Sequence, residues 1–344
     1  MKRIAYIELD THPEILSNFM ELMNDSKEFR VDYYISNKID RLRFAENSNI
    51  KIVTAETVLN QMKEHEYDLV LIGTIHRYFS TFKEIIQRYK TTAIVHNLNF
   101  SKTSKFQLFQ NIWKEDIVFR LKLFLKEGLL SVPKVYQSLD YILVLDESFV
   151  RNKEVYLPIF YSSKNELSVS DDVLKIVIPG TVSQHRRGYE KVLKKLHQFK
   201  SNIQVVFLGK AQGLELDWLE NAKSTLPKNV DIIYFKEKLS GENFSKYMIN
   251  ANVLWCPIQS KTQFMSVEEF YGKTKMSGNI GDAIKYGKPA IFPSTYQSKF
   301  PFIISEEIDV ESQLSNVSKQ CFDFEILEKR KVLLQLEEVL KKLI

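Results

Sequence analysis

The segment 269–291 holds residue types that bind a diphosphate. A loop rich in Gly, Lys and Ser leads through Lys275, Ser277 and Gly278 into a predicted helix that carries Asp282. A helix start offers unpaired backbone N–H groups and the positive end of a dipole, which suit a phosphate. The lysines add positive charge, and the Asp282 carboxylate can accept hydrogen bonds from sugar hydroxyls. These features predict a site for a nucleotide-sugar diphosphate, and the alternative is a surface loop entering an ordinary helix.

Glycines and cations also follow three predicted strands in the second half of the chain. Gly180 follows the first of them, and Arg186 and Arg187 stand at the start of the next helix. A glycine permits close backbone approach, and arginines bind a diphosphate through paired hydrogen bonds. The alternative is a pair of surface arginines. Gly209 follows the second strand, and Lys236 follows the third, where we expect it to lie along a nucleobase.

Three histidines follow predicted strands in the first half of the chain. His12 stands at a helix start, and His76 and His96 follow two later strands. Histidine is the usual general base for a hydroxyl acceptor, and Asp10 or Glu14 could orient or replace it. A single histidine is more often structural, but three at one sheet edge favour catalysis. The sequence does not rank His12 above His96 as the catalytic residue.

Several other chemistries lack their motifs. No Gly-x-Gly-x-x-Gly follows the first strand, which argues against a nicotinamide cofactor. There is no phosphate-loop motif, no Gly-x-Ser-x-Gly elbow and no His-Glu-x-x-His helix. No Asp-x-Asp signature for a metal-bound nucleotide is present, so we expect no metal and no cofactor besides the donor substrate.

Length and composition predict two α/β domains. The 344 residues are 44% hydrophobic with a net charge of +5, too weakly basic for a dedicated nucleic-acid binder. Short β-branched runs alternate with helical patterns, which is typical of parallel sheets with crossover helices. We expect two Rossmann-like, doubly wound domains facing across a cleft. They are an acceptor-binding domain over 1–160 with a helical insertion at about 102–135, a nucleotide-sugar-binding domain over 161–323, and a terminal helix over 324–344.

The insertion 102–135 is both aromatic and basic. Its seven Lys and Arg residues outnumber three acidic ones, and its aromatics are Phe106, Phe109, Trp113, Phe119 and Phe124. Such a face suits a membrane headgroup layer, although core helices with a solvated charged face fit equally well. No signal peptide or long apolar run is found, and the two cysteines lack metal-ligand spacing. We therefore expect a cytoplasmic protein, with peripheral contact at the inner face of the cell membrane through 102–135 as one alternative.

Over about 174–294 the chain resembles the GT-B glycosyltransferases, closest to the bacterial group 1 (retaining) family. The likeness rests on Gly180 with Arg187-Gly188, on the run from Asp282 to Pro289, and on the stretch 247–257. It implies that the strand–Gly segment and basic pair hold the donor diphosphate and that Asp282 binds the donor ribose. It also implies that the donor phosphate itself takes the acceptor proton, while His96 binds the sugar or stabilises the developing charge.

Two positions depart from that family. Thr274 stands where the family has a Glu eight residues before the ribose-binding acid, and 9–13 replaces its Gly-Gly loop. The second departure is consistent with an inverting mechanism that uses His12 as base, as in other GT-B branches.

The resemblance implies a metal-independent hexosyltransferase. It would move a sugar from a nucleotide-diphosphate donor to a hydroxyl of a cell-surface polysaccharide or lipid-linked glycan. A sugar-nucleotide epimerase and a non-catalytic sugar-nucleotide-binding subunit are the alternatives.

Overall fold

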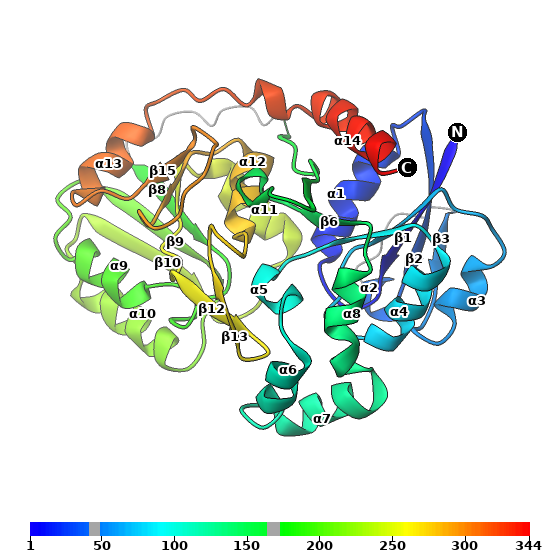
Figure 1. The fold of residues 1–344 in the computed structure, drawn as a ribbon. Helices are drawn as coiled ribbons and strands as arrows, with labels where there is room; N and C mark the ends of the chain where they lie inside the picture. Colours follow the sequence, from blue (N-terminus) through cyan, green and yellow to red (C-terminus); the bar gives the residue numbers. More distant parts are fainter. Residues whose placement is uncertain (41–48, 164–172) are drawn as a thin grey trace. The chain divides into compact units, whose positions relative to one another are not determined.

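The computed structural model describes residues 1–40, 49–163 and 173–344. Most of the polar stretch 162–172, which the sequence suggests as a domain boundary, lies outside these residues. The chain divides into two compact units, which are coloured by sequence in Figure 1. Unit 1 comprises Met1–Ile159, Gln263–Glu269 and Lys329–Ile344, and unit 2 comprises Phe160–Thr262 and Phe270–Glu328.

Within its described residues, unit 1 is built on a seven-stranded parallel sheet with the order β3-β2-β1-β4-β5-β6-β7. Strands of a parallel sheet are covered on both faces, so they need continuous apolar runs, and every side chain of β4 is buried. The strand order reverses between β1 and β4. At such a switch point the loops at the carboxyl ends diverge and leave room for a ligand. The strands are β1 (Lys2–Glu8), β2 (Phe29–Ile35), β3 (Ile50–Ile52), β4 (Leu69–Ile72), β5 (Thr91–Ile94), β6 (Tyr141–Val144) and β7 (Glu154–Tyr156).

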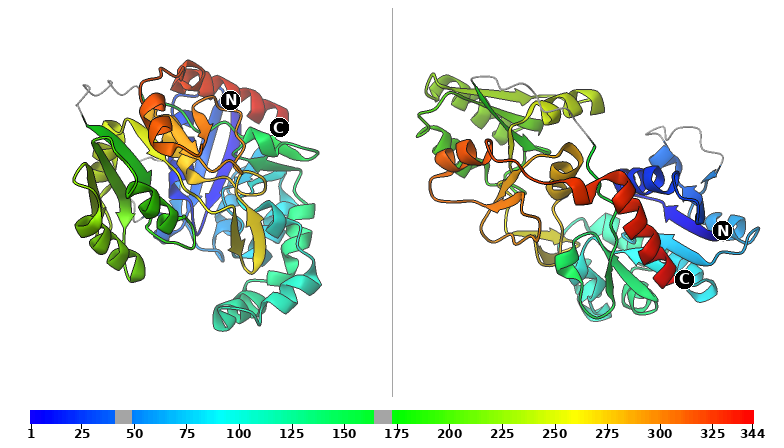
Figure 2. Two further views of the ribbon diagram at one scale, coloured as in Figure 1. Left: turned by 90° about the vertical axis from the view of Figure 1, so that its left-hand side faces the viewer. Right: turned by 90° about the horizontal axis from the view of Figure 1, so that it is seen from above.

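The helices of unit 1 connect these strands. Right-handed crossovers that run in opposite directions from the switch point place helices on both faces of the sheet. Figure 2 shows this sheet and its helices from two further sides. The helices are α1 (Pro13–Met23), α2 (Asn37–Asp40), α3 (Val58–Met62), α4 (Phe79–Arg88), α5 (Leu98–Ser101), α6 (Lys105–Asn111), α7 (Ile117–Lys126), α8 (Val132–Gln137) and α14 (Lys329–Leu343), with short 3-10 turns at Leu129–Ser131 and Glu147–Phe149.

Within its described residues, unit 2 has a six-stranded parallel sheet with the order β10-β9-β8-β11-β14-β15. Its switch point lies between β8 and β11. The strands are β8 (Leu174–Pro179), β9 (Ile203–Lys210), β10 (Val230–Phe235), β11 (Val253–Trp255), β14 (Ala290–Phe292) and β15 (Ile303–Ser305). The helices are α9 (Tyr189–Leu196), α10 (Leu214–Thr225), α11 (Gly241–Asn250), α12 (Gly278–Tyr286) and α13 (Val310–Val317), followed by a 3-10 turn at Glu325–Leu327.

The C-terminal helix returns to unit 1. It begins at Lys329, five residues later than the sequence pattern suggests, and lies beside α1 in Figure 1. Ser26 Oγ donates to Glu337 at 2.6 Å, and Lys341 pairs with Glu28 at 2.8 Å. Leu333, Leu336, Leu340 and Leu343 of α14 are buried, whereas Leu334 is exposed.

A hairpin of β12 (Lys261–Phe264) and β13 (Val267–Phe270) was not expected from the sequence, and its residues 263–269 belong to unit 1. Its turn residues, Met265 and Ser266, both have positive φ, which is typical of a tight hairpin turn. Glu269, which is 0% exposed, accepts the backbone N–H groups of Asn99 at 3.2 Å and Phe100 at 2.8 Å. This carboxylate therefore fastens the hairpin to the start of α5.

A second buried carboxyl ends β1. Glu8 is fully buried and accepts hydrogen bonds from the Thr74 hydroxyl at 2.8 Å and from the Asp10 and Thr11 N–H groups at 3.2 Å. Desolvation outweighs these bonds and raises the pKa of Glu8 to about 8. Gly73 leaves room for this carboxyl, because a Cβ there would lie 2.6 Å from Glu8 Oε2.

The pKa of Glu8 generates a testable stability profile. The raised pKa means that the folded protein holds this proton more tightly than the unfolded chain does. The stabilisation is complete below the ordinary carboxyl pKa and is lost as the pH rises through about 8. We expect the free energy of unfolding of the wild-type protein to fall by on the order of 3 kcal/mol as the pH rises from about 5 to about 8. This fall should be absent in Glu8→Gln, which has no titrating group at that position. Urea unfolding of both proteins across this range measures the difference, and parallel profiles would contradict it.

The hairpin contact gives a second prediction. Glu269→Ala leaves two backbone N–H groups without their carboxylate, so we expect a loss of about 2 to 4 kcal/mol in the free energy of unfolding. The matched control is Glu268→Ala, because that neighbouring side chain is exposed. Equal losses in both variants, measured by urea unfolding, would show that the buried carboxylate does not anchor the hairpin.

Candidate functional site

The three histidines predicted from the sequence lie together at the switch point of unit 1. The rings of His12 and His96 stack with centroids 3.8 Å apart. His76 meets each of them edge-on at 5.9 Å. They come together because His12 follows β1, His76 follows β4 and His96 follows β5, and these strands are neighbours in the sheet.

Hydrogen bonds fix how each ring presents its nitrogens. His12 Nδ1 donates to Glu14 Oε1 at 2.9 Å, so the neutral ring carries its lone pair on Nε2. His96 Nε2 donates to the Gly73 carbonyl at 3.2 Å, and His76 Nε2 accepts from the Asn97 amide at 3.0 Å. His12 is therefore the histidine whose carboxylate partner leaves Nε2 suited to accept a proton.

The partner of His12 is held as an anion. Partial desolvation acts to raise the pKa of Glu14, although its side chain is 64% exposed, but the hydrogen bond from His12 and the charge interaction with His12 outweigh it and bring this pKa below its ordinary value. A carboxylate on one imidazole nitrogen orients the ring and stabilises the imidazolium that forms when the other nitrogen takes a proton.

His12 also has a strained backbone. It has φ 61°, in the left-handed region, although it precedes Pro13 and is not a glycine. Tyr78, which follows β4 on the other side of the switch point, has φ 55°. Such strain collects at functional sites, where surrounding structure holds it in place.

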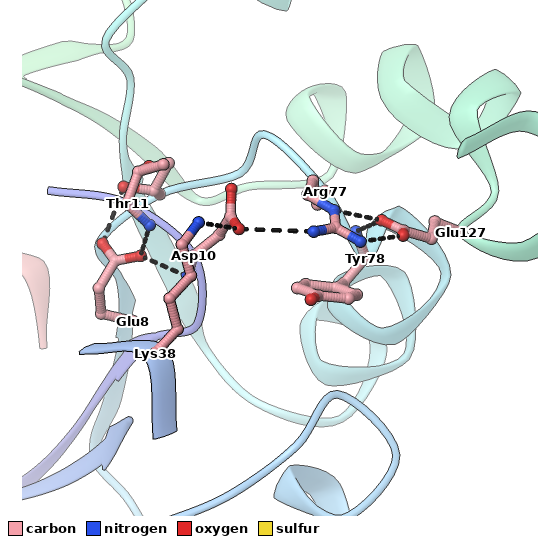
Figure 3. A network of polar contacts seen from close by, with 8 residues as sticks. Glu8, Asp10, Thr11, Lys38, Arg77, Tyr78 and Glu127 are labelled. Carbon is pink, nitrogen blue, oxygen red and sulfur yellow. Dashed lines mark hydrogen bonds and ion pairs between the residues drawn. The ribbon is translucent and has the colours of Figure 1, made fainter. Parts of the chain in front are cut away.

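Asp10 has a different partner from the one the sequence suggested. Its carboxylate lies 2.9 Å from Lys38 Nζ and 3.6 Å from an Arg77 nitrogen, as Figure 3 shows. Arg77 Nε also donates to Glu127 at 3.0 Å, and this pairing is the main reason that the pKa of Arg77 is raised. Glu14 and not Asp10 orients His12. Asp10 instead lines a pocket of about 230 Å³ together with Lys38, Thr54, Glu56, Arg77 and Tyr78.

In unit 2, Arg187 lies over the end of β8. Gly180 has φ +106°, and a Cβ there would stand 2.4 Å from Arg187 Nη2. The guanidinium donates to the Thr181 carbonyl at 3.3 Å and to Asn279 Oδ1 at 3.1 Å. Its Nε is buried and has no hydrogen-bond partner among the described residues. The predicted Gly180–Arg187 pair thus forms one fixed cationic corner.

Asn279 joins that corner to the start of α12. Its side chain, 3% exposed, donates to the Pro179 carbonyl at 3.2 Å and to Asp282 at 3.1 Å while it accepts from Arg187. Ser277 caps the helix by accepting the Asn279 N–H, and Gly278 is exposed at the first position. Of the predicted donor residues, Gly180, Arg187, Ser277, Gly278 and Asp282 therefore meet at one place.

Gly209 also belongs to this corner. The other predicted donor residues, Arg186, Lys236 and Lys275, have different surroundings. A Cβ on Gly209 would lie 2.3 Å from the Gly180 carbonyl, so this close approach needs glycine. Arg186 is exposed, and Lys236 forms an exposed ion pair with Glu220 on α10 at 2.6 Å. Lys275 is half-buried in the turn before α12, where its carbonyl accepts the Gly272 N–H at 3.0 Å.

Two residues of the site were missed by sequence reasoning. Asn279 was passed over because an Asn in a helix start is common; its spacing of three from Asp282 was the available signal. The ring centroids of Phe264 and His76 are 4.3 Å apart. Phe264 belongs to unit 1 as part of the β12–β13 hairpin, and the sequence has no Asn-Gly turn that would predict this hairpin.

Among the described residues, no group of three or more His, Cys, Asp or Glu side chains has an arrangement that could hold a metal ion. No helix within those residues is both long and apolar enough to cross a bilayer.

By sequence, no protein-family model and no curated protein matches the chain. By structure it is similar to AviGT4, a glycosyltransferase involved in avilamycin A biosynthesis, with a TM-score of 0.56, 9% identity and coverage of 100% of this chain and 97% of that one. HepE of Anabaena, in complex with UDP and glucose, gives 0.54 at 10% identity over 99% and 100%. The UDP-GlcNAc 2-epimerase of Neisseria meningitidis, bound to UDP-GlcNAc, gives 0.52 at 11% identity over 98% and 100%.

Likeness at such low identity carries the fold and not the function. The predicted α/β class is confirmed, and the two parallel sheets are those of GT-B structures. The finer likeness to the group 1 family stays a prediction. The chain has the GT-B fold.

Proposed function

We propose that the protein is a glycosyltransferase that moves a sugar from a nucleotide-diphosphate sugar to a hydroxyl group. The observation that carries this proposal is the cationic corner of unit 2, where Arg187, Gly180 and Asn279 adjoin the start of α12. It stands at the switch point of a doubly wound sheet, where ligands bind in such folds. The GT-B fold supports the proposal as an analogy.

The donor diphosphate lies against Arg187 and the first turn of α12. Negative charge grows on the diphosphate as its bond to the sugar breaks, and a prearranged guanidinium with helix N–H groups stabilises that charge. Asp282, which Asn279 holds by a hydrogen bond at 3.1 Å, accepts from donor hydroxyls. Lys275, Arg186 and Lys236 remain proposed donor contacts.

His12 acts as the general base. Its Nε2 takes the proton of the acceptor hydroxyl, the hydroxyl oxygen forms the new bond to the sugar, and the diphosphate leaves with the old bonding electrons. The carboxylate of Glu14 stabilises the resulting imidazolium through the 2.9 Å bond to Nδ1. A protein base of this kind favours inversion at the sugar carbon. His96 supports His12 by stacking, and the pocket that Asp10 lines offers the Thr54 hydroxyl and the charged groups of Lys38 and Glu56 to a sugar acceptor.

The acceptor class and place of action extend this proposal. A cell-surface polysaccharide or its lipid-linked precursor is the acceptor, and the reaction runs at the cytoplasmic side of the cell membrane without a metal ion. The basic, aromatic character of 102–135 supports this choice.

One observation favours a second candidate, a non-catalytic sugar-nucleotide-binding subunit. Thr274 replaces the acid that the retaining family uses, and its hydroxyl is occupied in accepting the Phe270 N–H at 2.9 Å. Incubation with donor alone and with acceptor separates the candidates. Transfer or donor hydrolysis supports the enzyme, binding without turnover supports the subunit, and an altered sugar still on its nucleotide indicates an epimerase.

The donor site is tested by Arg187→Ala and Asn279→Ala. Loss of a charged hydrogen-bond donor to the diphosphate, or of the side chain that positions it, should raise the Kd for the nucleotide sugar about 10- to 100-fold. A thermal-shift panel of nucleotide sugars identifies the donor, and titration calorimetry then gives the Kd. The control is Lys194→Ala, an exposed cation on the neighbouring helix α9. Unchanged donor affinity in a folded Arg187→Ala protein would exclude this corner as the donor site.

The catalytic base is tested by His12→Asn. Asn tolerates the left-handed backbone at this position, so the variant removes the imidazole with little added strain. We expect kcat to fall about 100-fold or more with little change in the Kd for donor, and Glu14→Gln to cause a smaller fall. Rates are measured as nucleoside-diphosphate release in the presence of acceptor.

The matched control for that series is His197→Asn, which changes an exposed histidine on the other unit. If His12→Asn turns over at the wild-type rate while His96→Asn does not, His96 is the base and the assignment made here is wrong.

A further inference from the structure

The helices α6 and α7 carry an unusual share of exposed apolar surface. Of the fifteen large hydrophobic residues that are exposed within the described parts of the chain, seven lie between 106 and 125. Val118 is 85% exposed, Leu125 74% and Phe106 71%. A concentration of exposed apolar side chains on one short segment points to an interaction site.

These residues form outward stripes on both helices. Phe106 and Phe109 lie one turn apart on α6, and the exposed Trp113 follows in the turn after that helix ends at Asn111. On α7, Val118 and Leu125 have a seven-residue spacing, with Leu121 between them. Figures 1 and 2 show both helices at the margin of unit 1, away from its sheet. The solvent face of an ordinary surface helix would be polar here.

The inward faces of the same helices are already satisfied. Leu108, Ile112 and Leu123 are buried against unit 1. Arg120, 4% exposed, turns inward and donates to the Asn111 carbonyl and, at 2.9 Å, to Ser266 Oγ of the hairpin. The helix pair is thus held by its own buried contacts, to which Phe109 adds an edge-on contact with Phe124, while Phe106, Val118 and Leu125 stay largely exposed.

Exposed lysines are interspersed with the exposed apolar residues along 105–126. Lys105 and Lys114 flank the stripe of α6, and Lys122 and Lys126 lie on α7. None of these four pairs with a carboxylate of the described residues, whereas Glu115 is engaged by Arg120 at 3.2 Å. A lysine beside an apolar residue can bury its stem while its ammonium group stays at the polar layer.

We propose that this α6–α7 surface, consisting of Phe106, Phe109, Trp113, Val118 and Leu125 with the four lysines, rests on a bilayer that contains anionic lipids. Apolar side chains would enter the headgroup layer, Trp113 would lie at its boundary, and the lysines would meet lipid phosphates. Helices of seven and ten residues lie on such a surface and do not cross it. A second protein would more often meet an apolar centre with a polar rim, whereas here lysines alternate with the apolar residues.

Vesicle flotation tests the proposal. We expect the wild-type protein at low salt to float with vesicles of phosphatidylcholine containing about 30% phosphatidylglycerol, and to float less with pure phosphatidylcholine or at high salt. The variant Phe106→Glu/Trp113→Glu/Val118→Glu should lose at least about 10-fold in partitioning, because charge replaces the inserted groups. The matched control is Leu214→Glu/Ile308→Glu/Leu334→Glu, which changes three exposed apolar residues elsewhere.

A second readout locates the contact. Bromine-labelled lipids should quench the fluorescence of wild-type protein, and Trp113→Phe should remove that quenching. Absence of flotation at low salt, or equal loss in both triple variants, overturns the proposal. Self-association that the first triple variant abolishes, without flotation, would assign the surface to a second copy of the chain instead. No nucleotide sugar enters these assays, so their outcome is independent of the proposed transfer activity.

Discussion

The placement of the Arg187 guanidinium over the Gly180 backbone is the interaction on which the proposed chemistry depends. Two constraints create it: Gly180 has a backbone conformation and a clearance that admit only glycine, and Asn279 accepts from the guanidinium at 3.1 Å. Asn279 simultaneously holds the end of β8 and the Asp282 side chain. A cation fixed in this way needs little reorganisation when charge develops beside it. The corner is therefore a product of the strand order, which brings a loop after β8 beside the start of α12.

Unit 1 contributes a pair of carboxyl groups with opposite environments. Glu8 is enclosed at the end of β1, and burial raises its pKa to about 8. Six residues later the more exposed Glu14 faces His12, whose hydrogen bond and charge interaction lower the pKa of Glu14 against a partial desolvation. Such divergence identifies which carboxyl is held neutral and which is held as an anion. The neutral Glu8 holds the loop after β4 through the Thr74 hydroxyl. The anionic Glu14 binds His12 Nδ1, so Nε2 is the acceptor nitrogen of that ring.

The elements with strong patterns could be predicted from the sequence, and those set by distant partners could not. Apolar runs such as 69–72 and the Ser277 cap of α12 have local signatures, and the three histidines followed from strand ends in a doubly wound order. The β12–β13 hairpin could not be predicted, because an isolated Glu269 is expected to be exposed. Its burial depends on the backbone N–H groups of Asn99 and Phe100, which are distant in sequence. Asp10 and Lys236 follow the strands β1 and β10, but their charges are engaged by Lys38 with Arg77 and by Glu220. Pairing across elements is not encoded in local spacing.

The proposed donor site requires unit 2 to recognise the diphosphate of a nucleotide sugar. Titration calorimetry with UDP-, GDP-, ADP- and dTDP-sugars, each compared with its phosphate-free nucleoside, measures this most directly. We expect at least one nucleotide sugar to bind about 100-fold more tightly than its nucleoside, because the guanidinium and helix start contact only the phosphates. Equal affinity for nucleoside and nucleotide sugar, or no binding by any member of the panel, would contradict the account.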